Sequence, residues 1–399
     1  MNIPILNTKV YNHPLVYLDN AATTQKPRRV VDTLSDYYLT LNSNIHRGTH
    51  HLATLATERY EAVRRQVQQF IHARSHREIV FTRGTTESIN LVAASFCQRF
   101  LHPYEEVIVS GMEHHSNIVP WQLACERVGA KLKVIPFNDE GVLDLRTYEN
   151  LFSVRTRLVA CNHVSNTLGT INPVKQITDI AHSHNVPVLI DGAQAVAHMP
   201  VDVQQIGCDF YCFSGHKMYA PMGVGVMYGR EELLNDLPPY QGGGEMIQDV
   251  TFEKTTYNEL PFKFEAGTPS VGDVLGLGAA IDFLHEVGFD YIVRHEEELM
   301  RYAFDKLSQI PHIRFYGTAP NRTGVISFLV GDCSSYDVGT LLDKVGVAVR
   351  TGHHCTQPIM DRYGISGTVR ASFACYTTQA DIDALVAGLQ RILPLLLGK

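Results

Sequence analysis

One lysine stands at the polar end of an apolar run. Lys217 closes the strand-like segment DFYCFSGHK, and Ser214 and His216 come just before it. A lysine amine in such a place can form a Schiff base with an aldehyde cofactor once burial or a nearby cation lowers its pKa. The same lysine could be a strand-end side chain that reaches solvent, so this segment alone leaves both interpretations open.

A carboxylate at the end of another apolar run favours the cofactor interpretation. Asp191 closes the strand in VPVLIDGAQA, and Gln194 follows shortly after. Pyridoxal phosphate (PLP) needs a carboxylate against its pyridine nitrogen, because the protonated ring is the electron sink for carbanion chemistry. Gln194 could donate a hydrogen bond to the phenolic oxygen. A helix N-cap is the alternative role for Asp191.

A phosphate needs hydrogen-bond donors, and the segment RGTTESINL offers them. Thr85 and Thr86 lie between a predicted strand and a predicted helix, where free backbone N–H groups favour an anion. Ser214 and His216 could close the other side. The same segment also fits a helix capping box, but beside the lysine and the aspartate it indicates a phosphate cradle.

Two adjacent histidines follow a further predicted strand in GMEHHSNIVPW. His114 could stack on the cofactor ring and move protons. Adjacent histidines could instead bind a metal ion. Neither the cysteine nor the histidine spacing nearby matches a structural zinc site, so we expect no metal.

The segment VAVRTGHHCTQPIM holds a cysteine in a polar setting. Arg350, His353 and His354 precede Cys355. Cationic neighbours favour the thiolate, so we expect Cys355 to be nucleophilic and accessible; an incidental loop cysteine is the alternative. Arg370 in GTVRASFACYT could hold a substrate carboxylate through two parallel hydrogen bonds, or it could form a surface ion pair.

Strands and helices alternate from about residue 79 in a way that would position these side chains. Continuous apolar strands separated by helices predict a largely parallel α/β sheet covered on both faces. The polar residues follow directly after the strands, where open α/β sheets place their sites. Beyond about residue 290 an α+β pattern begins. We expect a large domain over 13–290, and a smaller domain of 1–12 and 291–399 that carries the loop around Cys355.

The composition excludes several classes of protein. A chain of 399 residues exceeds what one hydrophobic core usually supports. A net charge of −7 argues against a general surface for nucleic acid or anionic membrane. We see no signal peptide and no long apolar run, so a cytoplasmic protein is the simplest expectation. The Gly-rich stretch QGGGEMIQDV at 241–250 is expected to be a mobile loop.

The order of the motifs resembles that of class V, fold-type-I PLP-dependent enzymes. The segments concerned are DNAATTQKP, NIHRGTHHLA, GTTESINLVA, MEHHSNIVPWQ, HVSNTLG, DGAQA, FSGHK, FEAGTPS, RTGHHC and VRASFACY. From about residue 15 onward the chain is most similar to the group II, SUF-type cysteine desulfurases, a branch that includes selenocysteine-lyase-like members. RTGHHC points to group II, since group I has a longer cysteine loop.

The resemblance implies a fold and a set of cofactor contacts. The protein would be a homodimer. Each chain would have a large PLP-binding domain, built on a mainly parallel seven-stranded sheet flanked by helices, and a smaller α+β domain. Lys217 would hold PLP covalently, and His114 would stack on its ring. The other residues implied to bind the cofactor are Asp191, Gln194, Thr85, Thr86, Asn166, Ser214 and His216, with Thr268 reaching the phosphate from the other subunit.

The resemblance also implies a reaction. A cysteine desulfurase converts L-cysteine to L-alanine and would hold the sulfur on Cys355 as a persulfide, for a SUF-type acceptor protein in iron–sulfur cluster assembly. Lys217 and His114 would move protons. The residues implied to bind substrate are Arg370, Asn166, Arg350 and His46. Thr356 departs from the small apolar residue usual after the cysteine.

Two alternatives remain open from the sequence. A selenocysteine lyase, acting on L-selenocysteine, or another PLP-dependent β-lyase would use the same lysine and aspartate but would not need Cys355. A non-enzymatic sulfur or metal carrier could use His353, His354 and Cys355, but it would have no need for Lys217 and Asp191.

Overall fold

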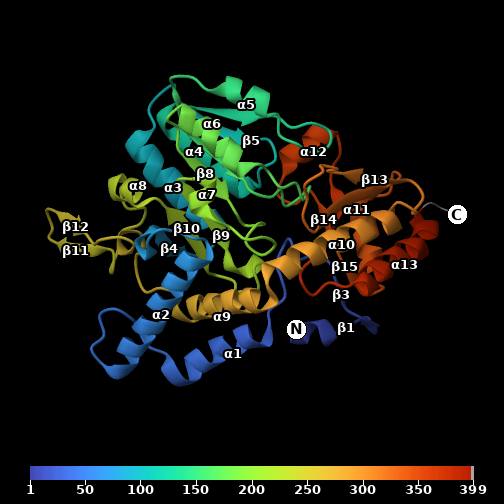
Figure 1. The fold of residues 1–399 in the computed structure, drawn as a ribbon, viewed down its shortest axis with the longest axis horizontal. Helices are drawn as coiled ribbons and strands as arrows, with labels where there is room; N and C mark the ends of the chain where they lie inside the picture. Colours follow the sequence, from blue (N-terminus) through green and yellow to red (C-terminus); the bar gives the residue numbers. More distant parts are fainter. Residues whose placement is uncertain (397–399) are drawn as a thin grey trace.

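A seven-stranded sheet forms the centre of the molecule (Figure 1). The computed structural model describes residues 1–396. The strand order is β4-β10-β9-β8-β7-β5-β6, and β10 alone runs antiparallel to its neighbours. This confirms the expected mainly parallel sheet. The strands span Ile79–Thr82 (β4), Gly225–Gly229 (β10), Phe210–Ser214 (β9), Val188–Asp191 (β8), Thr156–Asn162 (β7), Glu106–Ser110 (β5) and Lys131–Ile135 (β6).

Apolar residues on both faces of the strands explain why helices cover both sides of this sheet. Alternate residues of a strand point to opposite faces: Val107 and Val109 pack in one buried cluster, and Ile108 packs in another. Helices α3 (Thr85–Phe100) and α4 (Val119–Val128) contribute to the first cluster, and α2 (His51–Phe70), α6 (Val174–Ser183) and α9 (Val271–Val287) to the second.

A second, antiparallel sheet lies towards the C-terminal end, on the right of Figure 1. Its order is β13 (Ile313–Tyr316), β14 (Val325–Val330), β17 (Thr368–Ser372) and β16 (Arg350–Gly352). Helices α10 (Phe289–Leu307), α11 (Ser335–Asp343) and α13 (Gln379–Leu396) pack against it around their own apolar cluster.

The N-terminal segment crosses over to this second unit. Strand β3 (Val16–Tyr17) pairs in parallel with β15 (Val347–Ala348), and Leu18 packs in the apolar cluster of the second sheet. Residues 16–18 lie in the range that we assigned to the large domain. The domain limits given above therefore stay a prediction.

The Gly-rich stretch is only partly a loop. The expectation of a loop over 241–250 is wrong for Ile247–Val250 (β11), because this segment pairs with Thr255–Tyr257 (β12) in a hairpin that projects from the body of the molecule (Figure 1). The remaining α-helices and strands are β1 (Lys9–Val10), β2 (His13–Pro14), α1 (Arg28–Asp36), α5 (Leu145–Leu151), α7 (Val203–Ile206), α8 (Glu231–Asp236) and α12 (Gln357–Tyr363).

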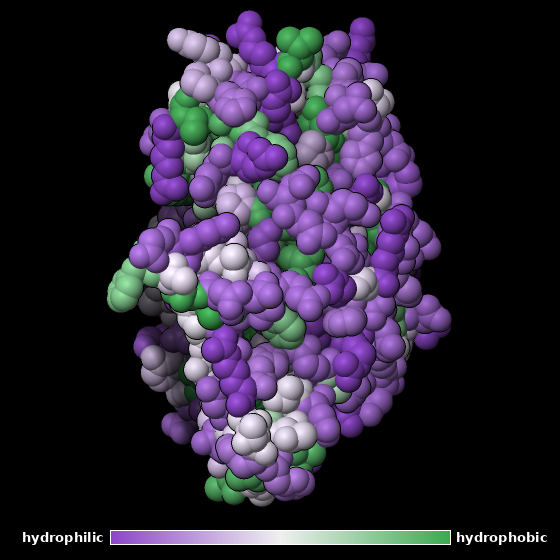
Figure 2. Space-filling view, turned by 90° about the vertical axis from the view of Figure 1, so that its left-hand side faces the viewer, coloured by the Kyte–Doolittle hydropathy of each residue, from purple (hydrophilic) through white to green (hydrophobic). Residues whose placement is uncertain are grey.

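The surface shown in Figure 2 is covered mainly by hydrophilic side chains, with scattered hydrophobic ones. Within residues 1–396, no helix combines the length and the apolar character needed to cross a bilayer.

Candidate active site

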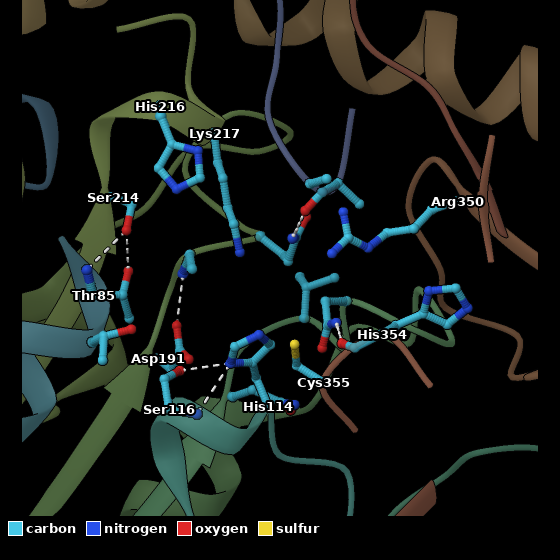
Figure 3. A pocket seen from close by; sticks show the side chains of 18 of the residues that line it. Thr85, His114, Ser116, Asp191, Ser214, His216, Lys217, Arg350, His354 and Cys355 are labelled. Carbon is cyan, nitrogen blue, oxygen red and sulfur yellow. Dashed lines mark hydrogen bonds between the residues drawn. The ribbon is translucent and has the colours of Figure 1, made fainter. Parts of the chain in front are cut away.

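A cavity of about 220 Å³ opens where β7, β8 and β9 end, between the two sheets (Figure 3). Asn162, Asp191 and Ser214, the last residues of these strands, all line it. The cavity brings together most of the site residues predicted from the sequence. These are Thr85, Thr86, His114, Asn166, Asp191, Gln194, Ser214, His216, Lys217, Arg350, Cys355 and Arg370.

Lys217 lies one short turn beyond β9, and its side chain extends into the cavity (Figure 3). Burial lowers the pKa of its amine, and the positive charges of Arg370 and Arg350 act in the same direction, while Asp191 opposes them. A lowered pKa increases the unprotonated fraction of the amine at neutral pH. Lys217 is therefore suited to nucleophilic attack and to accepting a proton.

Asp191 presents a buried carboxylate with little hydrogen bonding of its own. Its Oδ1 accepts a bond from the backbone N–H of Ala193 at 2.9 Å. Burial raises its pKa, and the Lys217 charge lowers it. A buried carboxylate needs a cationic or donor partner to remain ionised. A protonated ring nitrogen is such a partner.

A cradle with the donors for a phosphate lies at the start of α3. Thr85 donates its backbone N–H to Ser214 Oγ at 2.8 Å, and the two hydroxyl oxygens lie 2.7 Å apart. The buried Nδ1 of His216 has no hydrogen-bond partner among the described residues. The free N–H groups of the helix start favour an anion. An unpartnered imidazole nitrogen in the same cavity fits the same ligand.

Gly225 lets two backbone segments meet beside the cradle. A Cβ at this position would lie 2.4 Å from the Gly84 Cα. Real side chains do not approach so closely, so only glycine allows β10 to reach the segment that begins α3.

His114 is held in a defined tautomer at the cavity wall. Its Nδ1 accepts a hydrogen bond from the backbone N–H of Ser116 at 3.1 Å, so the ring proton is on Nε2. Burial, with a further contribution from the Lys217 charge, lowers the pKa of His114 to about 3. The ring is therefore neutral near pH 7 and offers an Nε2–H donor.

Arg370 is buried and is only partly satisfied by the protein. Its Nη1 donates to the Asn166 carbonyl at 2.9 Å, and its Nη2 donates to Asp19 Oδ1 at 3.2 Å. Its buried Nε has no partner among the described residues. A guanidinium with an unused donor, facing a cavity, fits a carboxylate ligand. Asp19 was not among the predicted site residues.

Cys355 lies across the cavity from Lys217, and its sulfur points inward (Figure 3). The cysteine is half-buried, and no disulfide involves it. Of the two histidines expected beside it, His354 does not supply a positive charge, because burial lowers the pKa of His354 to about 2 and its Nε2 bonds to the Thr368 hydroxyl. The charged neighbours are the arginines, Arg350 and Arg370.

Two predicted residues do not reach this cavity within one chain. His46 places Nε2 at 3.0 Å from Glu61 Oε1 and packs edge-on against Tyr60. Thr268 lines a separate cavity with Glu265. The role implied for Thr268 involves a second subunit. The substrate-binding role implied for His46 and the role of Thr268 both stay predictions.

Sequence reasoning missed a buried carboxyl that bonds to Asn162 in the cavity wall. Glu113 accepts hydrogen bonds from the Asn117 side chain at 2.7 Å and from the backbone N–H of Asn162 at 2.8 Å. Burial raises its pKa to about 8. The only sequence signal was its place after a strand, directly before His114.

Residues 16–385 match the family described as aminotransferase class-V. This match spans the whole cavity and both sheets. The chain belongs to the aminotransferase class-V family, the family that the motifs indicated.

The names of several similar proteins state one activity. A cysteine desulfurase of Klebsiella pneumoniae is 51% identical over 396 residues, which are 99% of this chain and 97% of the relative. The crystal structure of the cysteine desulfurase CsdA from Escherichia coli is 41% identical, with a TM-score of 0.89 over 96% of this chain and 95% of that chain. The structure of a cysteine desulfurase from Thermococcus onnurineus NA1 is 37% identical, with a TM-score of 0.92 over 100% and 99%. Within the class-V family, the chain therefore belongs to the cysteine desulfurases.

Proposed function

We propose that this protein takes the sulfur of L-cysteine onto Cys355 as a persulfide and leaves L-alanine. The observation that carries the proposal is that the Cys355 sulfur faces the same small cavity as Lys217 and Arg370. One cavity thus combines a nucleophilic thiol, a basic amine and a site for a carboxylate.

PLP is the cofactor of this family, and the residues of the cavity fit it. When bound, PLP supplies an electron sink that stabilises negative charge at the substrate Cα. Lys217 would hold its aldehyde carbon, and Asp191 would lie against its ring nitrogen. The residues that would hold its phosphate and its other polar groups are Thr85, Thr86, Ser214, His216 and Gln194.

Arg370 would hold the carboxylate of L-cysteine, assisted by Asn166. The unpartnered Nε of Arg370 and the fixed position of its Nη1 leave a defined direction for a carboxylate. Arg350 adds a second positive charge at the cavity wall. The substrate would thus be oriented with its sulfur towards Cys355.

Two groups of the chain would move protons. The Lys217 amine would accept the Cα proton, because burial favours its neutral form. His114 would donate from Nε2, the nitrogen that its bonds to Ser116 leave protonated.

The sulfur step conserves atoms and electrons. The Cys355 thiolate attacks the substrate sulfur, so an S–S bond forms while the substrate Cβ–S bond breaks and its electron pair stays on carbon. Proton transfer to that carbon gives L-alanine. Cys355 is left as a persulfide, whose outer sulfur an acceptor thiol can remove by exchange.

The partners expected from the sequence belong to this proposal. A homodimer would let Thr268 complete the phosphate site of a second copy. A SUF-type acceptor protein in the cytoplasm would carry the sulfur to iron–sulfur cluster assembly. The short, hydrogen-bonded loop around Cys355 supports this, because it has little reach of its own and an acceptor thiol must come to it.

Alanine formation from L-cysteine, with a reductant present, tests the proposal. We expect alanine from the native protein and a loss of most of it in Cys355→Ser, while the variant keeps the visible absorption of its cofactor. Equal alanine from both proteins would show that Cys355 is not the acceptor and would favour a β-lyase. Equal turnover with L-selenocysteine in the two proteins would not count against the proposal, since release of selenium does not need the thiol.

A further inference from the structure

The loop that carries Cys355 holds an unfavourable backbone conformation. We define this cysteine loop as residues 353–357. His354 and Cys355 have φ of +52° and +56°, a left-handed conformation that side chains with a Cβ rarely adopt. Two such residues in succession persist only if surrounding contacts hold them.

His115 makes two hydrogen bonds to the backbone of the cysteine loop. Its backbone N–H donates to the Cys355 carbonyl at 2.8 Å. Its ring Nε2 accepts from the backbone N–H of Gln357 at 3.1 Å. One residue therefore fixes the backbone at the cysteine and again two residues later.

Other groups hold the rest of the loop, including Thr167, whose hydroxyl lies 2.7 Å from the Thr356 hydroxyl. The Cys355 N–H donates to His353 Nδ1 at 3.1 Å, and Asn166 donates to the His354 carbonyl at 2.9 Å. The His115 and His353 rings lie with their centroids 5.6 Å apart. The His115 ring binds the last residue of the loop, Gln357, from outside it.

We propose that His115 is a positioning residue that holds the Cys355 thiol at the angle needed to attack the substrate sulfur. This inference rests on the proposed function and assigns a role to the second histidine of MEHHSN, which the sequence left without one. His115 acts through the loop backbone and touches no reacting atom.

The hydrogen bond defines the state of the ring. An Nε2 that accepts from an N–H carries no proton, so the ring proton of His115 is on Nδ1. Burial lowers the pKa of His115, and the neighbouring His353 acts in the same direction. The ring therefore stays neutral and able to accept at pH 7.

Three variants of the full-length, PLP-loaded protein separate this role from general stability. His115→Ala removes the ring acceptor but keeps the backbone N–H to Cys355. His115→Gln restores an acceptor, because Oε1 of glutamine lies about as far along the side chain as Nε2. His72→Ala is the matched control, since the His72 ring also bonds to a backbone group, the Val201 carbonyl, in another part of the chain.

The first readout is persulfide formation on Cys355 by rapid quench with L-cysteine. We expect His115→Ala to lower the rate constant at least about tenfold with little change in KM, because a small displacement of a reacting group slows chemistry without weakening binding. His115→Gln should recover most of the rate, and His72→Ala should match the native protein. A native rate in His115→Ala, or a glutamine variant as slow as alanine, would overturn the inference.

The second readout does not depend on the reaction. Amide hydrogen exchange over residues 353–359 should be at least about tenfold faster in His115→Ala than in the native protein, and unchanged in His72→Ala. Unchanged exchange in His115→Ala would overturn the inference. If the native protein formed no persulfide, the proposed function would fail, while exchange would still decide whether His115 holds the loop.

Discussion

Asp19 Oδ1 accepts a hydrogen bond from Arg370 Nη2 at 3.2 Å at the edge of the cavity. Asp19 comes from the N-terminal segment that pairs with the second sheet, and its backbone bridges to Ser372 in β17. The carboxylate orients one side of the buried guanidinium and leaves the Nε without a partner. This arrangement leaves a donor of Arg370 free for the second carboxylate that we propose it binds, that of the substrate.

Arg370→Lys should raise KM for L-cysteine much more than it lowers kcat. Lysine keeps the charge but loses the planar fork, and a hydrogen bond to a charged group contributes about 1.5–3 kcal/mol, so we expect KM to rise about tenfold to a hundredfold. Steady-state kinetics measure this. Arg362→Lys, which pairs with Asp139 on the surface, is the control. An unchanged KM in Arg370→Lys would mean that the substrate carboxylate binds elsewhere.

His114→Asn should lower kcat by about 10² to 10⁴, the usual contribution of a positioned acid or base. Because burial lowers the pKa of His114 to about 3, this histidine does not titrate between pH 5 and 9. The acid limb of the native pH–rate profile should therefore persist in the variant. Loss of that limb in His114→Asn would show that His114 does ionise in this range.

Gly225→Ala should weaken PLP binding by at least about tenfold. The added Cβ would lie 2.4 Å from the Gly84 Cα, and overpacking of this kind usually costs about 1–3 kcal/mol. Equilibrium dialysis of the apo protein measures the affinity, and circular dichroism checks the fold. Gly242→Ala, where a Cβ meets nothing within 4 Å, should bind PLP normally. A folded Gly225→Ala with native affinity would contradict the cradle assigned here.

His198→Gln should destabilise the protein in a pH-dependent way. His198 is buried, and its Nδ1 lies 2.9 Å from the carboxylate of Glu296, a residue of α10. Burial alone would lower the pKa of His198, but the carboxylate outweighs it and the pKa is raised. A raised native pKa stabilises the fold fully below the unfolded value of about 6.5, and this stabilisation is lost as pH rises through the native pKa.

Thermal unfolding of the native protein and of His198→Gln across pH 5.5 to 9 checks this dependence. We expect the gap in Tm to be largest near pH 6 and to narrow at alkaline pH. His72→Gln should show no such trend. A gap that widens as pH rises would contradict the sign of the shift.

The sequence predicted those site residues that stand at or just after the end of a strand. Lys217 and Asp191 each close an apolar run, and the carboxyl ends of parallel strands meet at one edge of a sheet. Their convergence, and that of the threonines at the start of α3, could be predicted from this rule alone. Only the family resemblance predicted that the loop around Cys355 lies at the same cavity, because no local sequence pattern places the second sheet against the first.

The features that the sequence did not predict depend on contacts between residues far apart in the chain. Asp19 reaches Arg370 because β3 pairs with β15, a contact between the two ends of the chain that no short motif encodes. The burial of His354 could not be predicted either, because its partner Thr368 lies on β17, outside the loop. The sequence analysis treated His354 as a positive charge, whereas in the structure its ring is neutral.

The mass of the Cys355 peptide after one turnover tests the central claim most directly. The PLP-loaded protein is mixed with L-cysteine without reductant, quenched, alkylated, digested and analysed by mass spectrometry, with alanine measured in the same samples. The account predicts one added sulfur atom on Cys355, in proportion to the alanine formed, and on no other cysteine. Alanine formed with an unmodified Cys355, or with the sulfur on another cysteine, would contradict it.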